Sequence, residues 1–194
     1  MPTRSYPVIP GTPGLVADIQ ALRPTPGTCI FIDVTGSTAM KTMKSRAEWI
    51  VLLSNFIGDT RAWLQDFPLL KTIGDELMYY IEDRDLEQKG MNHFQVYDAL
   101  WKIATQQSHL YPDVKVSAAW CDDVYTLTFI PGQQDYYGLG VDRTARLKGH
   151  VGNKQVIIDE ALYRKVEADI HAEGGLHAHT STQRLHGPNA VNLK

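Results

Sequence analysis

The chain has 194 residues, of which 43% are hydrophobic and 21% charged, as is typical of a soluble globular domain with one sizeable core. Its formal net charge of -3 gives no overall bias toward nucleic acid, and no apolar run approaches the roughly 20 residues that span a bilayer. Residues 1–14 (MPTRSYPVIPGTPG) lack the apolar centre of a signal peptide, and Cys29 and Cys121 lie in apolar runs. We therefore expect a cytoplasmic protein with reduced thiols that binds neither nucleic acid nor membranes.

The N-terminal part predicts an extended segment, then a strand, then helices. Residues 1–26 contain six of the ten prolines, so we expect an extended or loosely packed lead-in. The apolar run 29–34 predicts a buried strand. Residues 37–66 predict one or two helices, because apolar side chains recur there at helical spacing: Trp49, Leu52, Leu53, Phe56 and Ile57.

The middle of the chain predicts a hairpin, a helix and two strands. Segment 69–81 (LLKTIGDELMYYI) is apolar on both sides of Gly74-Asp75, which indicates a hairpin with a two-residue turn. Residues 84–110 predict one helix. Segments 114–121 (VKVSAAWC) and 124–130 (VYTLTFI) predict two strands joined at Asp122-Asp123.

The C-terminal part predicts two more helices and short strands. Segment 136–150 (YYGLGVDRTARLKGH) begins with glycines and becomes helical, and segment 154–170 predicts a short strand that Asp159 caps before a helix. The tail 181–194 (STQRLHGPNAVNLK) could supply two closing strands. This order of elements predicts an α+β fold with a largely antiparallel sheet.

The stretch 29–43 (CIFIDVTGSTAMKTM) combines a strand, an acid, a Gly-Ser-Thr turn and a helix. Such a turn directs free backbone N–H groups at one spot, which suits a phosphate, although the spacing of a P-loop is absent. Asp33 beside a phosphate would repel it unless a cation lies between them, and Mg²⁺ would resolve that conflict. A helix cap by Asp33 or Ser37 is an equally ordinary explanation.

Two further groups of charged residues could complete such a site. Asp75 lies at the tip of the predicted hairpin, and two carboxylates at neighbouring strand ends can hold two metal ions roughly 3.5–4 Å apart. Gly-Asp is also an ordinary turn sequence. Asp142 and Arg146 have i, i+4 spacing, so they either form a surface ion pair or place the guanidinium on a triphosphate.

In chain order, FIDVTGST, LLKTIGDELM and DYYGLGVDRTARL resemble the catalytic domain of class III nucleotidyl cyclases, and LHGPNAVNLK resembles the closing segment of that family. The resemblance implies a catalytic domain over residues 27–194, behind the lead-in 1–26. It also implies a ferredoxin-like βαββαβ core, with a mostly antiparallel sheet flanked by helices. The family works as a head-to-tail homodimer whose two active sites each take residues from both subunits.

The resemblance implies that Asp33 and Asp75, with the backbone carbonyl of Val34, bind two Mg²⁺ or Mn²⁺ ions per active site. Backbone amides of residues 34–38 would cradle the phosphates. The residues of that turn that the resemblance implies for substrate binding are Gly36, Ser37 and Thr38.

The resemblance also implies how the nucleoside is held. Lys71 and Asp135, acting from the partner subunit, would read the base edge, and Arg146 would stabilise the α-phosphate in the transition state. Asp142 stands where the family usually has an asparagine that positions the ribose. The implied reaction is attack of the ribose 3′-hydroxyl on the α-phosphate of a nucleoside triphosphate, which yields a 3′,5′-cyclic nucleotide and pyrophosphate.

The base is not fixed by these residues, because one donor and one acceptor fit any base and the size of the pocket must decide. Bulky residues where purine cyclases usually have small ones favour a pyrimidine: Trp120, Tyr125, Tyr136 and Tyr137. The chain also resembles the pyrimidine cyclases of antiphage (Pycsar-type) systems, whose cyclic nucleotide activates a separate effector protein. We therefore expect conversion of UTP to cUMP. An adenylate cyclase making cAMP and a non-catalytic nucleotide-binding module are the alternatives.

Overall fold

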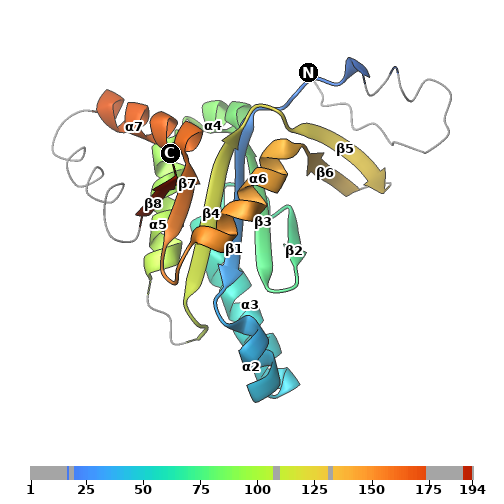
Figure 1. The fold of residues 1–194 in the computed structure, drawn as a ribbon, viewed down its shortest axis with the longest axis vertical. Coiled ribbons are helices and arrows are strands. Elements are labelled where there is room, and N and C mark those ends of the chain that lie inside the picture. The colour runs from blue at the N-terminus through green and yellow to red at the C-terminus, as the bar shows by residue number, and fades with distance from the viewer. Residues whose placement is uncertain (1–16, 18–19, 107–109, 131–132, 174–189, 194) are drawn as a thin grey trace.

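A six-stranded sheet forms the centre of the structure, a computed structural model that describes residues 17, 20–106, 110–130, 133–173 and 190–193. The strand order is β2-β3-β1-β4-β7-β8 (Figure 1). The first four strands pair antiparallel, and the last two join in parallel. In the same order, the strands are Lys71–Ile73, Glu76–Glu82, Gly27–Val34, Val114–Cys121, Val156–Asp159 and Ala190–Leu193.

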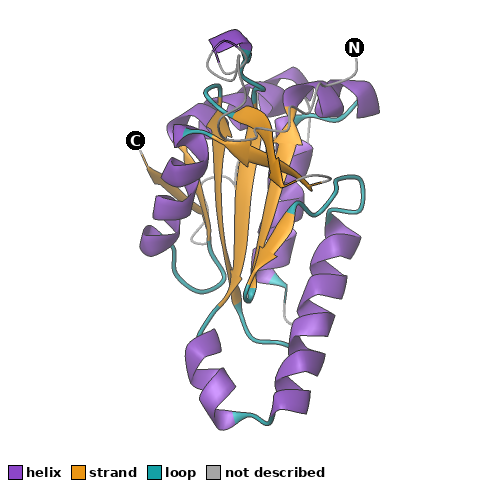
Figure 2. Cartoon of the chain, turned by 90° about the vertical axis from the view of Figure 1, so that its right-hand side faces the viewer, coloured by secondary structure: helices purple, strands orange, loops and turns teal. Residues whose placement is uncertain are grey.

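Helices cover both faces of this sheet (Figure 2). One face packs against α3 (Arg46–Trp63), α5 (His93–Thr105) and α7 (Glu160–Glu173), and the other is crossed by α6 (Leu139–Leu147) (Figure 1). The remaining helical segments are α2 (Ser37–Met43), α4 (Asp83–Lys89) and the 3-10 turn η1 (Lys148–His150). The order β1-α3-β2-β3-α5-β4 confirms the predicted ferredoxin-like core.

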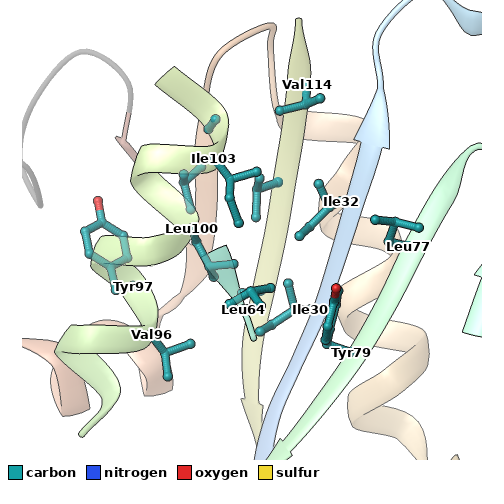
Figure 3. Close-up of a cluster of buried hydrophobic side chains, with 14 of the residues drawn as sticks. Ile30, Ile32, Leu64, Leu77, Tyr79, Val96, Tyr97, Leu100, Ile103 and Val114 are labelled. Carbon is teal, nitrogen blue, oxygen red and sulfur yellow. The ribbon is translucent and has the colours of Figure 1, made fainter. Parts of the chain in front are cut away.

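Strand β1 is buried on both faces, which explains its continuous apolar sequence. Ile30 and Ile32 point toward Leu100 and Ile103 of α5, as Figure 3 shows. The alternate residues, of which Phe31 is one, pack on the other face in a second cluster with Leu147 of α6. The two faces of β1 therefore belong to two separate parts of the core.

The hairpin prediction is confirmed, and the prediction of one helix over 84–110 is wrong. Strands β2 and β3 join through the two-residue turn Gly74-Asp75, in which Gly74 has a φ of 67°. The chain leaves the helix at Gly90, which has a left-handed φ of 62° after α4. Asn92 then caps α5 by accepting the backbone N–H of Gln95 at 2.9 Å.

The strand after Asp122-Asp123 does not join the main sheet. Strand β5 (Tyr125–Ile130) pairs antiparallel with β6 (Gln133–Tyr137) in a separate two-stranded sheet. Residues 1–16 and 18–19 of the predicted lead-in, and residues 181–189 and 194 of the tail, lie outside the described residues. No helix among the described residues is long and apolar enough to cross a membrane.

Candidate functional site

A row of three charged residues crosses the sheet at one end of β1. Asp33 pairs in register with Glu76 of β3 on one side and with Lys115 of β4 on the other. Directly paired residues in an antiparallel sheet project from the same face, and Asp33 lies two residues after Phe31, so this is the α6 face. The Lys115 ammonium lies 3.3 Å from the Asp33 carboxylate.

Asp75 lies beside this row at the tip of the β2–β3 hairpin, where 13% of its side chain is exposed. Its carboxylate accepts a hydrogen bond from Lys41 of α2 at 2.6 Å and another from the Ser37 hydroxyl. Burial alone would raise the pKa of Asp75, but these hydrogen bonds and the Lys41 charge outweigh burial and hold that pKa below its usual value.

Glu76 is the third carboxylate of this cluster, and no sequence motif predicted a role for it. It is buried, and its only ion pair within the described residues is with Lys148, at 2.5 Å. Burial raises the pKa of Glu76, the negative charges of Asp33 and Asp75 raise it further, and Lys148 offsets only part of this. Three acidic side chains therefore meet at one rim of the sheet.

The donor atoms at this rim suit a hard divalent cation. Mg²⁺ and Mn²⁺ prefer carboxylate and carbonyl oxygens, which Asp33, Asp75 and the Val34 backbone can supply. Within the described residues, no group of three or more His, Cys, Asp or Glu side chains has the arrangement to hold a metal ion by itself. Phosphate oxygens and water would have to complete the coordination, as is usual for Mg²⁺.

The predicted phosphate turn lies between β1 and α2. Gly36 has a φ of 70°, a left-handed conformation that glycine adopts without strain, and α2 begins at Ser37. The Thr35 N–H already donates to the Asp113 carbonyl at 2.9 Å. This removes one amide from the predicted cradle of residues 34–38.

The structure brings Lys71 and Asp135 together within one chain. The Lys71 ammonium donates to both carboxylate oxygens of Asp135, at 2.9 and 2.7 Å. Asp135 is buried, and it also accepts the Tyr136 backbone N–H at 2.9 Å and the Tyr137 hydroxyl at 3.3 Å. Lys71 pairs in register with Met78, so it lies on the same face of the sheet as Asp33 and Glu76.

The bulky residues near this pair divide between core and surface. Tyr136 stacks on Tyr80 with ring centroids 4.3 Å apart and donates its hydroxyl to Glu82, so its ring belongs to the core. Trp120 packs against the opposite face of the sheet. The Tyr137 ring is partly exposed and lies beside the Lys71–Asp135 pair. Tyr137 is therefore the bulky residue that can limit room at the pair.

Asp142 and Arg146 both lie on the exposed side of α6. These two described side chains form no ion pair with each other, which leaves the guanidinium available to a ligand. With Leu139, Arg143 and His150, they line an open hollow of about 390 Å³. Two residues after Arg146, Lys148 reaches Glu76, so this end of α6 lies against the carboxylate rim.

No protein-family model and no curated protein sequence matches the chain, but solved structures resemble it. The guanylyl cyclase domain of the RhoGC fusion protein from the aquatic fungus Blastocladiella emersonii gives a TM-score of 0.63 at 14% identity, over 75% of this chain and 85% of that one. The guanylate cyclase domain of RhGC from Catenaria anguillulae, in complex with GTP, gives a TM-score of 0.60 at 13% identity, over 75% of this chain and 84% of that one. The chain has the fold of a class III nucleotidyl cyclase catalytic domain. The adenylyl cyclase CyaB from P. aeruginosa shares this cyclase fold, with a TM-score of 0.57 at 16% identity over 75% of this chain and 82% of that one.

The cyclase fold agrees with the architecture that the sequence resemblance implied. At these identities the likeness concerns the fold, so the roles of Asp33, Asp75 and Arg146 stay predictions. Four charged residues of the site have no signal in the sequence, because they reach their partners only in three dimensions: Lys41, Lys115, Lys148 and Glu76.

Proposed function

We propose that residues 27–194 form a nucleotidyl cyclase that converts a nucleoside triphosphate to a 3′,5′-cyclic nucleotide and pyrophosphate. One observation carries the proposal: within a cyclase fold, Asp33 pairs in register with Glu76, which directly follows Asp75, so the three acids lie near one another at one rim of the sheet. The donor and acceptor pair of Lys71 and Asp135 lies on the same face. A purely structural role gives no reason for so many charges to gather at one edge.

In this mechanism Asp33, Asp75 and the Val34 carbonyl would hold two Mg²⁺ or Mn²⁺ ions. Bound metal would supply Lewis acidity for the attacking 3′-hydroxyl and for the leaving pyrophosphate. The free amides that follow Thr35 hold phosphate oxygens, and the Arg146 guanidinium neutralises charge that develops on the α-phosphate. Asp142 accepts a hydrogen bond from the ribose, since a carboxylate can replace an amide oxygen as an acceptor.

We propose that the active unit is a head-to-tail homodimer. Arg146 and Asp142 face outward from α6, so a ligand that reaches them needs a second surface opposite. Large apolar side chains are exposed around the α2–α3 corner, which projects beyond the sheet (Figure 2). They are Met43, Ile50 and Val51. Apolar surface of this kind supports a contact with another subunit.

We propose UTP as the preferred substrate and cUMP as the product. The Lys71–Asp135 pair offers donors and acceptors to any base, so shape must select. The Tyr137 ring beside the pair supports a smaller, pyrimidine base. An adenylate cyclase is the second candidate, because solved adenylyl and guanylyl cyclases share the fold. In the biological role that we propose, cUMP is a second messenger of antiphage defence that a separate effector protein senses.

Side-by-side kcat/KM values for UTP, CTP, ATP and GTP test the choice of base. We expect UTP to be best, and ATP as the clear best substrate would overturn the pyrimidine proposal. Replacing Tyr137 by Ala should raise kcat/KM for ATP relative to UTP by about 10- to 200-fold, the range for a change of hydrophobic bulk in a pocket. Tyr137→Phe keeps the ring and should leave that ratio within about threefold of wild type. If the ratio of kcat/KM for ATP to that for UTP in Tyr137→Ala equals the ratio in wild type, the Tyr137 ring does not select the base.

A further inference from the structure

Lys41 occupies an unexpected place beside the candidate metal site. Its ammonium lies 2.6 Å from Asp75 Oδ1 and 5.0 Å from the centre of the Trp49 ring on α3. The carboxylate and the aromatic face both attract a cation, so two groups hold the ammonium in this position. The Lys41 side chain is nevertheless 42% exposed, which leaves its four-carbon stem free to reorient.

The other two acids of the rim are arranged in the same way. Lys115 pairs with Asp33, and Lys148 pairs with Glu76. Each of the three carboxylates therefore has its own ammonium partner, and the rim is electrically balanced without a metal ion. A divalent cation that binds Asp75 meets a positive charge already in contact with one of the ligand oxygens, and like charges at this range repel.

The proposed position of the phosphates gives Lys41 an alternative partner. It lies four residues after Ser37 and three after Thr38, so all three side chains share one face of α2. That face begins at the turn where we place the phosphates. An ammonium displaced from Asp75 can therefore move to a phosphate oxygen without any change in the backbone.

We infer that Lys41 is a tethered cation that occupies Asp75 in the resting subunit and competes there with the divalent metal ion. When metal and nucleotide arrive together, the ammonium moves from Asp75 to the triphosphate. Lys41 thus weakens metal binding to the empty site and strengthens binding of the metal–nucleotide complex. The inference rests on the proposed function, because it needs Asp75 to be a metal ligand.

Mn²⁺ affinity of the nucleotide-free protein tests the inference, measured from the electron paramagnetic resonance signal of free Mn²⁺ during titration. Lys41→Gln should bind Mn²⁺ about three- to fivefold tighter than wild type, the upper range for losing a partly exposed ion pair. Lys41→Arg keeps the charge and should stay within about twofold of wild type.

Lys44→Gln is the matched control, because it removes the same charge from an exposed lysine that directly follows α2. Among the described residues, Lys44 forms no ion pair with Asp33, Asp75 or Glu76. The Mn²⁺ affinity of the Lys44→Gln variant should therefore stay close to that of wild type, since salt screens exposed charges beyond about 10 Å. An equal gain in affinity in Lys44→Gln would show a general charge effect and overturn the role of Lys41.

Asp75→Asn separates failure of this inference from failure of the metal site. If Asp75→Asn loses Mn²⁺ binding while Lys41→Gln binds like wild type, the metal site stands and the inference about Lys41 is wrong. If Asp75→Asn binds Mn²⁺ like wild type, Asp75 is no metal ligand and both proposals fail. In a second readout, Lys41→Gln should raise the KM for the metal–nucleotide complex severalfold. An unchanged KM would contradict the proposed movement of the Lys41 ammonium to the phosphates.

Discussion

Replacing Asp135 by Asn tests base recognition with a very small change in shape. In the structure this carboxylate accepts hydrogen bonds from Lys71, from the Tyr136 backbone and from the Tyr137 hydroxyl. The substitution removes the negative charge and puts an amide NH₂ where one acceptor oxygen was. Lys71 is 31% exposed, so water can still solvate its ammonium and the fold should tolerate the change.

The expected loss follows from one hydrogen bond to a charged acceptor. Such a bond contributes about 1.5–3 kcal/mol, and about 1.36 kcal/mol corresponds to a tenfold change in rate. The value of kcat/KM for the preferred nucleotide should therefore decrease roughly 10- to 150-fold. A purine that the Tyr137 ring keeps from reaching Asp135 should lose much less, so the preference for UTP over ATP should narrow by a similar factor.

The assay is kcat/KM of Asp135→Asn for UTP, CTP, ATP and GTP, each compared with wild type. Asp123→Asn is the matched control, since the Asp123 carboxylate accepts the Gly140 N–H at 3.1 Å and has no proposed role at the base. Asp123→Asn should change kcat/KM for all four nucleotides by the same factor. An equal loss for all four nucleotides in Asp135→Asn would refute the reasoning, because it would make this carboxylate a structural group.

The remaining predictions concern the metal ligands, the shared site and stability. Asp33→Ala and Asp75→Ala should each abolish cyclisation while circular dichroism shows an intact fold; near-normal turnover in either would exclude the two-metal mechanism. Mixing inactive Asp33→Ala and Arg146→Ala chains should restore activity if sites are shared, whereas no recovery in chains shown to exchange subunits would place each site in one subunit. Asp83→Asn should cost about 1–2 kcal/mol in urea unfolding at pH 7, because Asp83 accepts the Trp120 indole N–H at 2.9 Å. Burial raises the pKa of Asp83 but its hydrogen bonds outweigh that and lower it, so this cost should decrease as the pH decreases below about 4; a cost independent of pH would contradict that cause.

Local signals in the sequence were sufficient for the elements that make up the core. The apolar strand 29–34 and the Gly74-Asp75 turn each depend on neighbouring residues, and both were predicted correctly. The break at Gly90 also had a local signal, a glycine followed by the Asn92 cap, which the prediction of one helix over 84–110 did not take into account. The boundary between α4 and α5 could therefore be predicted only from the helix-end signals Gly90 and Asn92.

The electrostatic part of the site could not be predicted in the same way. Glu76 meets Asp33 through strand register, and Lys148 reaches Glu76 from 72 positions further along the chain. Likewise, no local pattern distinguishes Tyr136, which is buried, from Tyr137, which is partly exposed. Side chains alternate along a strand, so their roles depend on which face of β6 the rest of the fold covers.

Identifying the products of the purified protein tests the central claim most directly. The protein is incubated with each of the four nucleoside triphosphates and Mn²⁺ or Mg²⁺, and the products are separated and identified by mass spectrometry. The account predicts a 3′,5′-cyclic nucleotide, cUMP from UTP, released in equal amount with pyrophosphate and lost in Asp75→Ala. Nucleoside diphosphate with inorganic phosphate, or no product from any of the four nucleotides with either metal, would contradict it.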